Sequence, residues 1–202
     1  ILSGGSNTLV TDGFEGVIIQ PAYQGMGYME SDHDTVIVTV GSGVDWDHLV
    51  AKTVNRGLWG LENLSLIPGW VGASPFQNIG AYGVEVSDVI ESVSAYDMVE
   101  KKVKVFSNAD CEFSYRNSLF KKQAAQGNGP RYVITAVTFR LFKKPKPVIG
   151  YKDLQQIFGA KGAKQELQAI REAVIAIRQA KFPDLTMVGT AGSYFMNPII
   201  SV

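Results

Sequence analysis

The amino-acid sequence predicts an α+β fold rather than a doubly wound parallel sheet. Strand patterns dominate up to about residue 142, few helical patterns lie between them, and the longest helical pattern comes late in the chain. A doubly wound sheet needs a helix after nearly every strand, and the GxGxxG turn of Rossmann folds is absent. With 202 residues, 46% of them hydrophobic, the chain can bury a core in one large domain or two modest ones.

Composition excludes several classes of function. The 19 basic and 19 acidic residues cancel, so neither nucleic acid nor an anionic membrane is expected as a partner. No apolar run approaches the ~20 residues that cross a bilayer. Cys111 is the single cysteine, which rules out an intrachain disulfide and predicts a buried small side chain. His33 and His48 have no ligand partners at useful spacing, so no metal site is predicted.

The chain begins with a predicted strand and a glycine loop. Ile1-Leu2 is expected to end a strand, and residues 3–7 (SGGSN) follow as a loop. Extended backbone is expected again at residues 8–10 and 16–19. Exposed N–H groups in such a loop can hold a diphosphate, although a plain turn is the alternative.

A strand and a capped helix come next. Residues 36–40 (VIVTV) are dense in β-branched side chains and predict a strand. Asp45 is placed to cap a helix that starts at Trp46 and stops at Gly57. The residues expected to share its buried face are Leu49, Val50 and Val54.

The stretch from 60 to 83 neither alternates like a strand nor repeats like a helix, and it is nearly uncharged. It is therefore expected to be buried. Its glycines allow close approach of the backbone to a partner, and Ser74, Gln77 and Asn78 offer short directional hydrogen bonds. This combination favours a large planar polar ligand, with a packed loop of tight turns as the alternative.

The second half contains a hairpin, a long strand and two helices. Residues 92–99 and 103–106 form the hairpin pattern, and a strand is predicted from 131 to 142. The side chains expected on one side of that strand are Val133, Val137, Phe139 and Leu141. The basic, proline-broken stretch 143–147 is the best domain boundary. A short helix is predicted at 152–158.

A longer helix is predicted to run to Ala180, before Pro183, with Lys181 at its C-terminal end. The helical spacing that predicts it is carried by Leu167, Ile170, Val174 and Ile177.

Four sequence blocks carry a resemblance to a known family. IPGWVGASPFQNIGAYG at 67–83 closely resembles the flavin-binding signature of the UDP-N-acetylenolpyruvoylglucosamine reductase family. ILSGGSN at 1–7 is similar to the family's pyrophosphate loop, FSYRNSLFK at 113–121 to its catalytic arginine block, and AGSYFMNP at 191–198 to its catalytic serine block. The blocks occur in the family's order and span the whole chain.

The resemblance implies a FAD-binding fold of the PCMH/vanillyl-alcohol-oxidase type and a domain plan. Residues 1–142 would form the FAD-binding region, with 1–23 the remainder of a first lobe and 24–142 a second lobe. Residues 143–182 would be a connector with helices, and 183–202 the start of a substrate-binding domain. Family chains extend beyond both ends, so this sequence looks truncated at each terminus.

The same resemblance implies the chemistry. The family's enzymes use FAD and NADPH to reduce UDP-N-acetylglucosamine enolpyruvate to UDP-N-acetylmuramate for peptidoglycan, so a cytoplasmic and monomeric protein is expected. The residues that would hold FAD are Gly4, Gly5, Ser6, Asn7, Pro68, Gly69, Gly72, Ala73, Ser74, Gln77, Asn78, Gly80, Ala81 and Gly83.

Arg116 and Ser193 are the catalytic residues that the resemblance implies. A guanidinium can stabilise charge that develops beside a carboxylate, and a hydroxyl can donate the proton that follows. Outside these blocks, a structural ion pair and an ordinary loop serine would be the simpler interpretations. The implied substrate-binding residues are Tyr115, Tyr151, Lys181 and Asn197. The family's assisting glutamate would lie beyond Val202.

Three positions depart from the family pattern. Trp70 stands where a smaller residue is usual, Met196 replaces a lysine of many relatives, and Thr190 replaces a common asparagine. Two other functions remain open at this stage. One is a sugar or alcohol oxidase of the same flavin fold, which generally lacks the Ser193 block, and the other is a flavin-binding module without turnover.

Overall fold

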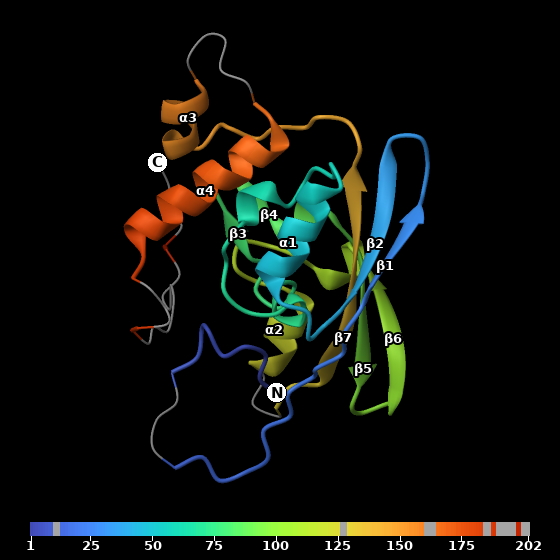
Figure 1. Ribbon diagram of the computed structural model, residues 1–202. Helices are drawn as coiled ribbons and strands as arrows, with labels where there is room; N and C mark the ends of the chain where they lie inside the picture. Colours follow the sequence, from blue (N-terminus) through green and yellow to red (C-terminus); the bar gives the residue numbers. More distant parts are fainter. Residues whose placement is uncertain (10–12, 126–128, 160–164, 184–186, 189–196, 199–202) are drawn as a thin grey trace.

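The computed structural model describes residues 1–9, 13–125, 129–159, 165–183, 187–188 and 197–198. Its centre is a five-stranded sheet in the order β1-β2-β7-β5-β6, in which every neighbouring pair is antiparallel (Figure 1). The strands are β1 Met26–Glu30, β2 Thr35–Gly41, β5 Ile90–Asp97, β6 Lys102–Ser107 and β7 Tyr132–Phe142, with a separate pair β3 Gly80–Ala81 and β4 Val84–Glu85. The helices are α1 Trp46–Asn55, α2 Leu119–Ala124, α3 Lys152–Phe158 and α4 Leu167–Lys181. The predicted α+β class is confirmed.

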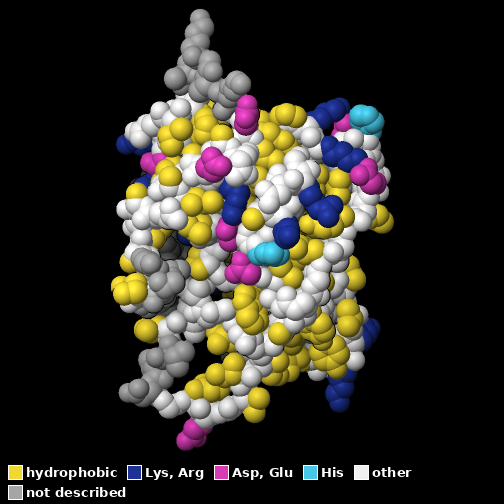
Figure 2. Space-filling model, in the orientation of Figure 1, with side chains coloured by type: hydrophobic (Ala, Val, Ile, Leu, Met, Phe, Trp, Pro, Cys, Tyr) yellow, Lys and Arg dark blue, Asp and Glu magenta, His cyan; other side chains and the backbone are white. Residues whose placement is uncertain are grey.

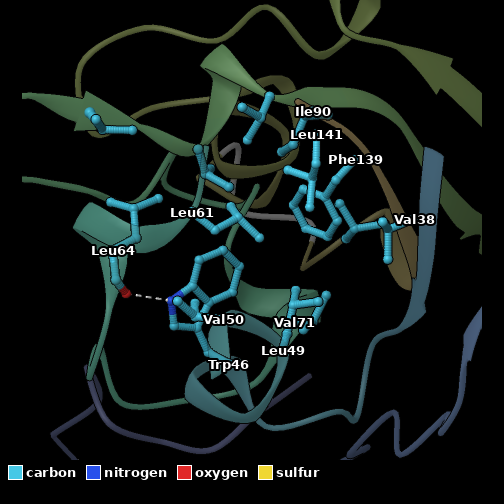
Figure 3. Packing of buried hydrophobic residues seen from close by; sticks show 14 of the residues in the cluster. Val38, Trp46, Leu49, Val50, Leu61, Leu64, Val71, Ile90, Phe139 and Leu141 are labelled. Atoms are coloured by element: carbon cyan, nitrogen blue, oxygen red, sulfur yellow. Dashed lines mark hydrogen bonds between the residues drawn. The ribbon is translucent and has the colours of Figure 1, made fainter. Parts of the chain in front are cut away.

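Helix α1 lies against the inner face of the sheet and begins as predicted. The Asp45 carboxylate accepts a hydrogen bond from the His48 N–H at 2.8 Å and so caps the helix. Trp46 follows at once and is only 1% exposed. Its indole Nε1 donates to the Leu64 carbonyl at 2.8 Å, which satisfies the one polar atom of this large buried side chain (Figure 3). The helix thereby fixes the start of the 60–83 stretch.

Strand β7 contributes alternate side chains to the middle of the core. Of the four residues predicted to share its buried face, one is wrong. Val137, Phe139 and Leu141 are fully buried, as predicted. Val133 is not, and Ile134 is buried in its place. The register against β5 shifts near Ser94 through a β-bulge, and one extra residue reverses which side chains face the core.

The N-terminal segment contradicts the predicted first strand. Residues 1–9 and 13–25 contain no strand, and the predicted strand at Ile1-Leu2 is wrong. One backbone hydrogen bond joins the Leu2 N–H to the Ile19 carbonyl at 2.9 Å. Val17 is 84% exposed. A strand needs a neighbour to pair its backbone groups, and sequence pattern alone did not show that this segment has no such ladder.

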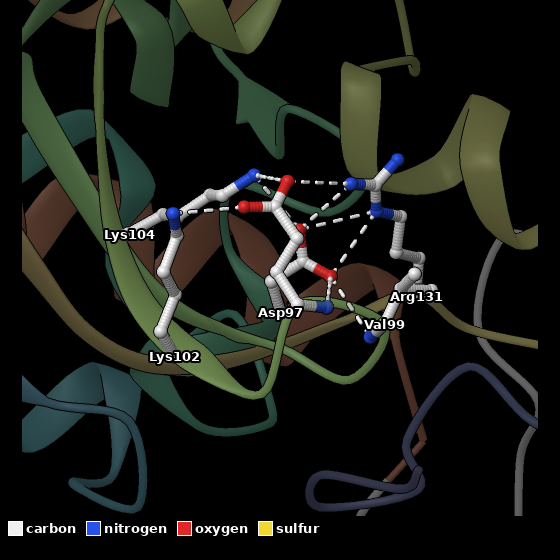
Figure 4. Close-up of polar contacts among 6 residues, drawn as sticks. Asp97, Val99, Lys102, Lys104 and Arg131 are labelled. Carbon is white, nitrogen blue, oxygen red and sulfur yellow. Dashed lines mark hydrogen bonds and ion pairs between the residues drawn. The ribbon is translucent and has the colours of Figure 1, made fainter.

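The far end of the predicted β5–β6 hairpin is held by a buried carboxylate (Figure 4). Asp97 accepts hydrogen bonds from Arg131 Nη2 at 2.8 Å and the Val99 N–H at 2.9 Å, and pairs with Lys104 Nζ at 2.9 Å. The hydrogen bonds from Arg131 and Lys104 hold the pKa of Asp97 well below its usual range, although burial opposes the shift. Figure 2 shows hydrophobic side chains gathered on this side of the molecule, where β6 exposes Val103 and Val105.

Helices α3 and α4 pack onto the same core as the sheet. Leu154 and Phe158 of α3 and Ile170 and Val174 of α4 are buried with the residues of the sheet and α1. Figure 1 shows α4 lying across the 60–83 stretch, and it contacts both α1 and the short turn Glu62–Leu64. Both predicted helices are confirmed, and Lys181 ends α4 as expected.

Three further properties predicted from the sequence are the burial of Cys111, the lack of a membrane-spanning segment and the lack of a metal site. Cys111 is fully buried, and burial raises the pKa of its thiol to about 12, so it is unreactive at neutral pH. Among the helices in the described ranges, none combines the length and apolarity that a membrane crossing requires. Within those same ranges, no three or more His, Cys, Asp or Glu side chains gather in a way that could hold a metal ion.

A cavity beside the glycine-rich loop

The 60–83 stretch is a folded, internally braced loop. It contains the turns Glu62–Leu64 and Val71–Ala73 and the strand β3. Gly60, Gly69 and Gly83 have φ of +127°, +117° and +83°, values that side-chain-bearing residues avoid. The fully buried Asn78 braces the loop from within, because it donates to Glu85 Oε2 at 2.8 Å and accepts from the Ser87 N–H at 3.1 Å.

Two of the loop's glycines are explained by contacts within the protein. A Cβ on Gly72 would lie 2.6 Å from Ser42 Cβ, and one on Gly80 would lie 3.0 Å from the carbonyl oxygen of Val84. The packed-loop interpretation therefore accounts for these two positions without a ligand. Ser74 is also structural, since it is buried and its Oγ donates to the Val71 carbonyl at 2.7 Å.

The first glycine loop lies against this stretch, although more than sixty residues separate the two in sequence. Ser6 Oγ donates to the Pro68 carbonyl at 3.1 Å, and Asn7 Nδ2 donates to Gln77 Oε1 at 3.2 Å. A Cβ on Gly4 would lie 3.2 Å from the Gly69 Cα, so the two backbones touch. The structure thus brings together the two segments that the sequence assigns to one ligand.

These segments fit a diphosphate-bearing flavin. Ser3 Oγ is buried and has no hydrogen-bond partner among the residues that the structure describes. A buried hydroxyl normally finds a partner, and a phosphate oxygen would supply one. The left-handed turn at Gly5, with φ of +73°, adds backbone N–H groups of the kind that bind anions.

A cavity of about 590 Å³ opens beside β3 and β4 and receives many of the predicted site residues. The predicted members of its lining are Gly80, Ala81, Gly83, Tyr115, Arg116, Tyr151, Lys181 and Asn197. The other lining residues are Tyr82, Val84, Glu85, Arg178 and Phe182. The predicted FAD residues that do not line it are Gly4, Gly5, Ser6, Asn7, Pro68, Gly69, Gly72, Ala73, Ser74, Gln77 and Asn78. The predicted catalytic Ser193 lies outside the described residues.

Arg116 presents a cation to this cavity. Its backbone is left-handed, with φ of +53°, and its Nη2 donates to the Gly80 carbonyl at 2.7 Å. The guanidinium lies 5.1 Å from the centre of the Tyr115 ring. Within the described ranges no carboxylate forms an ion pair with Arg116, so the structural ion pair considered from sequence has no counterpart there. A guanidinium held by a neutral carbonyl keeps its charge available for an anion.

Further lining residues come from Tyr151, which stands directly before α3, and from the end of α4. The exposed Tyr151 packs edge-on against Tyr82, with ring centres 5.3 Å apart. Lys181 Nζ lies 2.5 Å from Asp153 Oδ2, and that hydrogen bond raises the pKa of the lysine. Asn197 is exposed. The cavity is therefore lined by Arg116 and by cations of α4.

Arg178 is a lining residue that the sequence reasoning missed. It stands three positions before Lys181 on α4 and is half-buried, and its Nε donates to the Leu66 carbonyl at 3.2 Å. Burial lowers the pKa of its guanidinium from the ordinary value. From the sequence, only the apolar stripe of this helix and Lys181 at its end carried an expectation. A second cation on the face of Lys181 was the available signal.

Comparison with known proteins agrees with the geometry. A family model described as FAD binding domain matches residues 1–105. Over 201 residues the chain is 45% identical to the UDP-N-acetylenolpyruvoylglucosamine reductases of Bdellovibrio bacteriovorus and Dechloromonas aromatica, covering 100% and 99% of this chain and 59% of each relative. The crystal structure of the Thermus caldophilus reductase (MurB) is similar, with a TM-score of 0.57 and 25% identity over 79% of this chain and 48% of that one.

The match to the FAD binding domain model and the similarity to the reductase structure identify a flavin-binding fold, and its antiparallel sheet and the absence of a GxGxxG motif from the sequence agree with a non-Rossmann class. The chain belongs to the FAD binding domain family. FAD as the predicted cofactor and the resemblance to the reductases are thereby confirmed. The chain spans about 59% of the length of the curated relatives it matches.

Proposed function

We propose that this chain is part of an FAD-dependent reductase that uses NADPH to convert UDP-N-acetylglucosamine enolpyruvate into UDP-N-acetylmuramate, a step of peptidoglycan precursor synthesis. The observation that carries the proposal is the cavity, where Arg116 meets Tyr115, Tyr151, Lys181 and Asn197 from separate segments. The relatives that share 45% identity bear the name of this reductase. A site lined by cations from separate segments suits a substrate that carries a carboxylate and a diphosphate.

FAD would be held by the two adjoining glycine segments. Ser6 and Asn7 lie with Pro68 and Gln77 where the segments meet, and the unpartnered Ser3 hydroxyl is available there. When bound, the flavin supplies the hydride acceptor for NADPH and the hydride donor for the enolpyruvyl C3. Gly80, Ala81 and Gly83 lie at the boundary with the cavity, where the reacting end of the substrate would approach.

Arg116 would stabilise the charge that develops during reduction. Hydride addition at C3 places negative charge on C2, beside the substrate carboxylate. A cation fixed before the reaction stabilises that charge without the reorganisation that water requires. The hydrogen bond to the Gly80 carbonyl and the ring of Tyr115 hold the guanidinium in place.

Ser193 would donate the proton to C2, because a hydroxyl is an adequate acid toward a carbanion-like centre when its alkoxide is stabilised. The remaining lining residues would bind the substrate. Lys181 and Asn197 would contact the diphosphate, and Tyr115 and Tyr151 would contact other parts of the substrate; all four line the cavity. The pairing of Lys181 with Asp153 holds the ammonium at the end of α4.

We also propose the organisation of the protein around this site. Residues 1–142 form the flavin-binding region, 143–182 a connector with helices, and 183–202 the start of a substrate-binding domain. A cytoplasmic monomer without nucleic-acid or membrane partners is consistent with zero net charge. A role in cell shape and division would follow from peptidoglycan synthesis.

The test is to purify the protein, extract its flavin and follow NADPH oxidation. Oxidation that depends on UDP-N-acetylglucosamine enolpyruvate is the expected result. Oxygen consumption driven by a sugar or alcohol, with no response to the enolpyruvyl substrate, would instead identify an oxidase of the same fold. Bound FAD without turnover of either kind would identify a flavin-binding module.

A further inference from the structure

Arg178 carries a charge that forms no direct ion pair with a described carboxylate, although the Asp47 carboxylate lies near enough to raise its pKa. It is half-buried, and it lines the cavity. Its Nε–H is used by the Leu66 carbonyl, and the phenol of Tyr82 lies near enough to act on its pKa. Within the ranges that the structure describes, no Asp or Glu forms an ion pair with it. Burial of an uncompensated charge is costly, and buried charges in proteins are normally paired.

The other cations of α4 show how the same helix pairs its charges. Arg171, seven residues earlier, forms two hydrogen bonds of 2.8 Å with the Asp47 carboxylate. Lys181 is paired with Asp153. Arg178 therefore differs from both, and the feature that sets it apart from Arg171 is that it lines the cavity. An anion in the cavity would provide the missing partner.

We infer that Arg178 binds the diphosphate of a nucleoside diphosphate in this cavity, next to Lys181. The inference rests on the proposed function and adds a residue that the sequence resemblance did not supply. A guanidinium has five N–H donors in a planar fork, so the Leu66 carbonyl leaves donors for two-point contact with phosphate oxygens. Lys181 would contribute a single-point charge one helical turn away.

The experiment compares UDP with uridine as probes of the FAD-loaded protein, by titration calorimetry. The two compounds differ only in the diphosphate. Arg178→Gln is expected to lower the affinity for UDP by about 10- to 100-fold, the size of a lost charge-assisted contact, and to leave the affinity for uridine unchanged. Arg178→Lys keeps the charge but loses the planar fork of donors, so its affinity for UDP should lie between those of the wild type and Arg178→Gln. The salt dependence of UDP binding should weaken in Arg178→Gln.

Arg171→Gln is the matched control, since it removes the same group from the same helix away from the cavity. It should lower the melting temperature and leave UDP affinity unchanged. Equal losses for UDP and uridine in Arg178→Gln would mean that Arg178 only supports the wall through Leu66, and would overturn the inference. Unchanged UDP affinity in Arg178→Gln overturns it while the proposed function stands. Wild-type protein that binds UDP no better than uridine overturns both.

Discussion

The ion pair between Asp47 of α1 and Arg171 of α4 offers the most direct test of how the helices are held to the loop. Arg171 is 8% exposed and makes two 2.8 Å hydrogen bonds to the carboxylate. Asp47 also accepts the Leu66 N–H at 2.6 Å. Arg171→Met keeps the apolar stem and removes the guanidinium, so it leaves a partly buried carboxylate with one remaining partner.

The expected loss of unfolding free energy lies between two limits. Breaking a fully buried pair from one side costs about 3–5 kcal/mol, and exposed pairs contribute about 0–1 kcal/mol. The side chain of Asp47 is 26% exposed and that of Arg171 is 10% exposed, so about 2–3 kcal/mol is expected. For a chain of this length that corresponds to a fall in melting temperature of roughly 5–10 °C.

The stability loss in Arg171→Met is also expected to depend on pH. Burial raises the pKa of Asp47, but hydrogen bonds from Arg171 and the Leu66 N–H outweigh it, and the net pKa is lowered. A lowered carboxyl pKa contributes stability that is complete above the unfolded value of about 3.9 and is lost as the pH falls through the folded value. The difference between wild type and Arg171→Met should therefore be largest near pH 7 and narrow below about pH 4.

Urea unfolding at several pH values measures this difference. Lys122→Met is the control, because Lys122 pairs with Glu112 at the surface, with side chains 43% and 53% exposed. It should cost less than about 1 kcal/mol. An Arg171→Met cost no greater than that of Lys122→Met, or one that stays constant from pH 7 to pH 3.5, would show that the pair does not stabilise the fold as argued.

Three further predictions concern other parts of the molecule. Trp70→Thr should bind FAD more tightly in a fluorescence titration, because the indole packs against Gly4 and overpacking typically costs about 1–3 kcal/mol; weaker binding would mean that the indole supports the flavin. Ser193→Ala should leave NADPH-dependent flavin reduction intact and slow reoxidation by the enolpyruvyl substrate about 10²–10⁴-fold, as followed by flavin absorbance in stopped flow; equal effects on both steps would assign the serine a structural role. Asp97→Asn should lower the melting temperature at pH 7 and converge with wild type only in strong acid, since the lowered pKa of Asp97 stabilises the fold above its unfolded value; a difference that disappears already at pH 5 would contradict this.

Much of the fold followed from local sequence signals. The density of β-branched residues predicted β2, a capping aspartate predicted the start of α1, and the helical spacing of apolar residues predicted α4. These signals depend on residues close in sequence. The errors arose where the outcome depends on a distant partner. The bulge that buries Ile134 is a feature of pairing with β5, and Ile1-Leu2 lacks the paired ladder that a strand needs.

The candidate site was predictable in part for the same reason. Sequence blocks named residues such as Arg116, Tyr151 and Lys181, and the structure places these three around one cavity. Arg178 carried no motif. The features that single it out are three-dimensional, because it lines the cavity and forms no ion pair with a carboxylate of the described residues. Gly72 shows the opposite case, because a motif position that suggested a ligand is explained by contact with Ser42.

The segment proposed to hold the flavin and the helix that carries the cavity's cations, α4, meet at the peptide unit of Leu66. Leu66 has φ of +58°, a conformation that costs a residue with a side chain roughly 1–2 kcal/mol. Its N–H donates to Asp47, which Arg171 binds, and its carbonyl accepts from Arg178. Both arginines belong to α4, which carries Lys181, and Leu66 lies two residues before Pro68 of the proposed flavin segment. The strained peptide is thus held from both sides, by Asp47 of α1 and by Arg178 of α4, so the Arg178–Leu66 hydrogen bond ties a cation of the cavity directly to the segment that leads into the proposed flavin site.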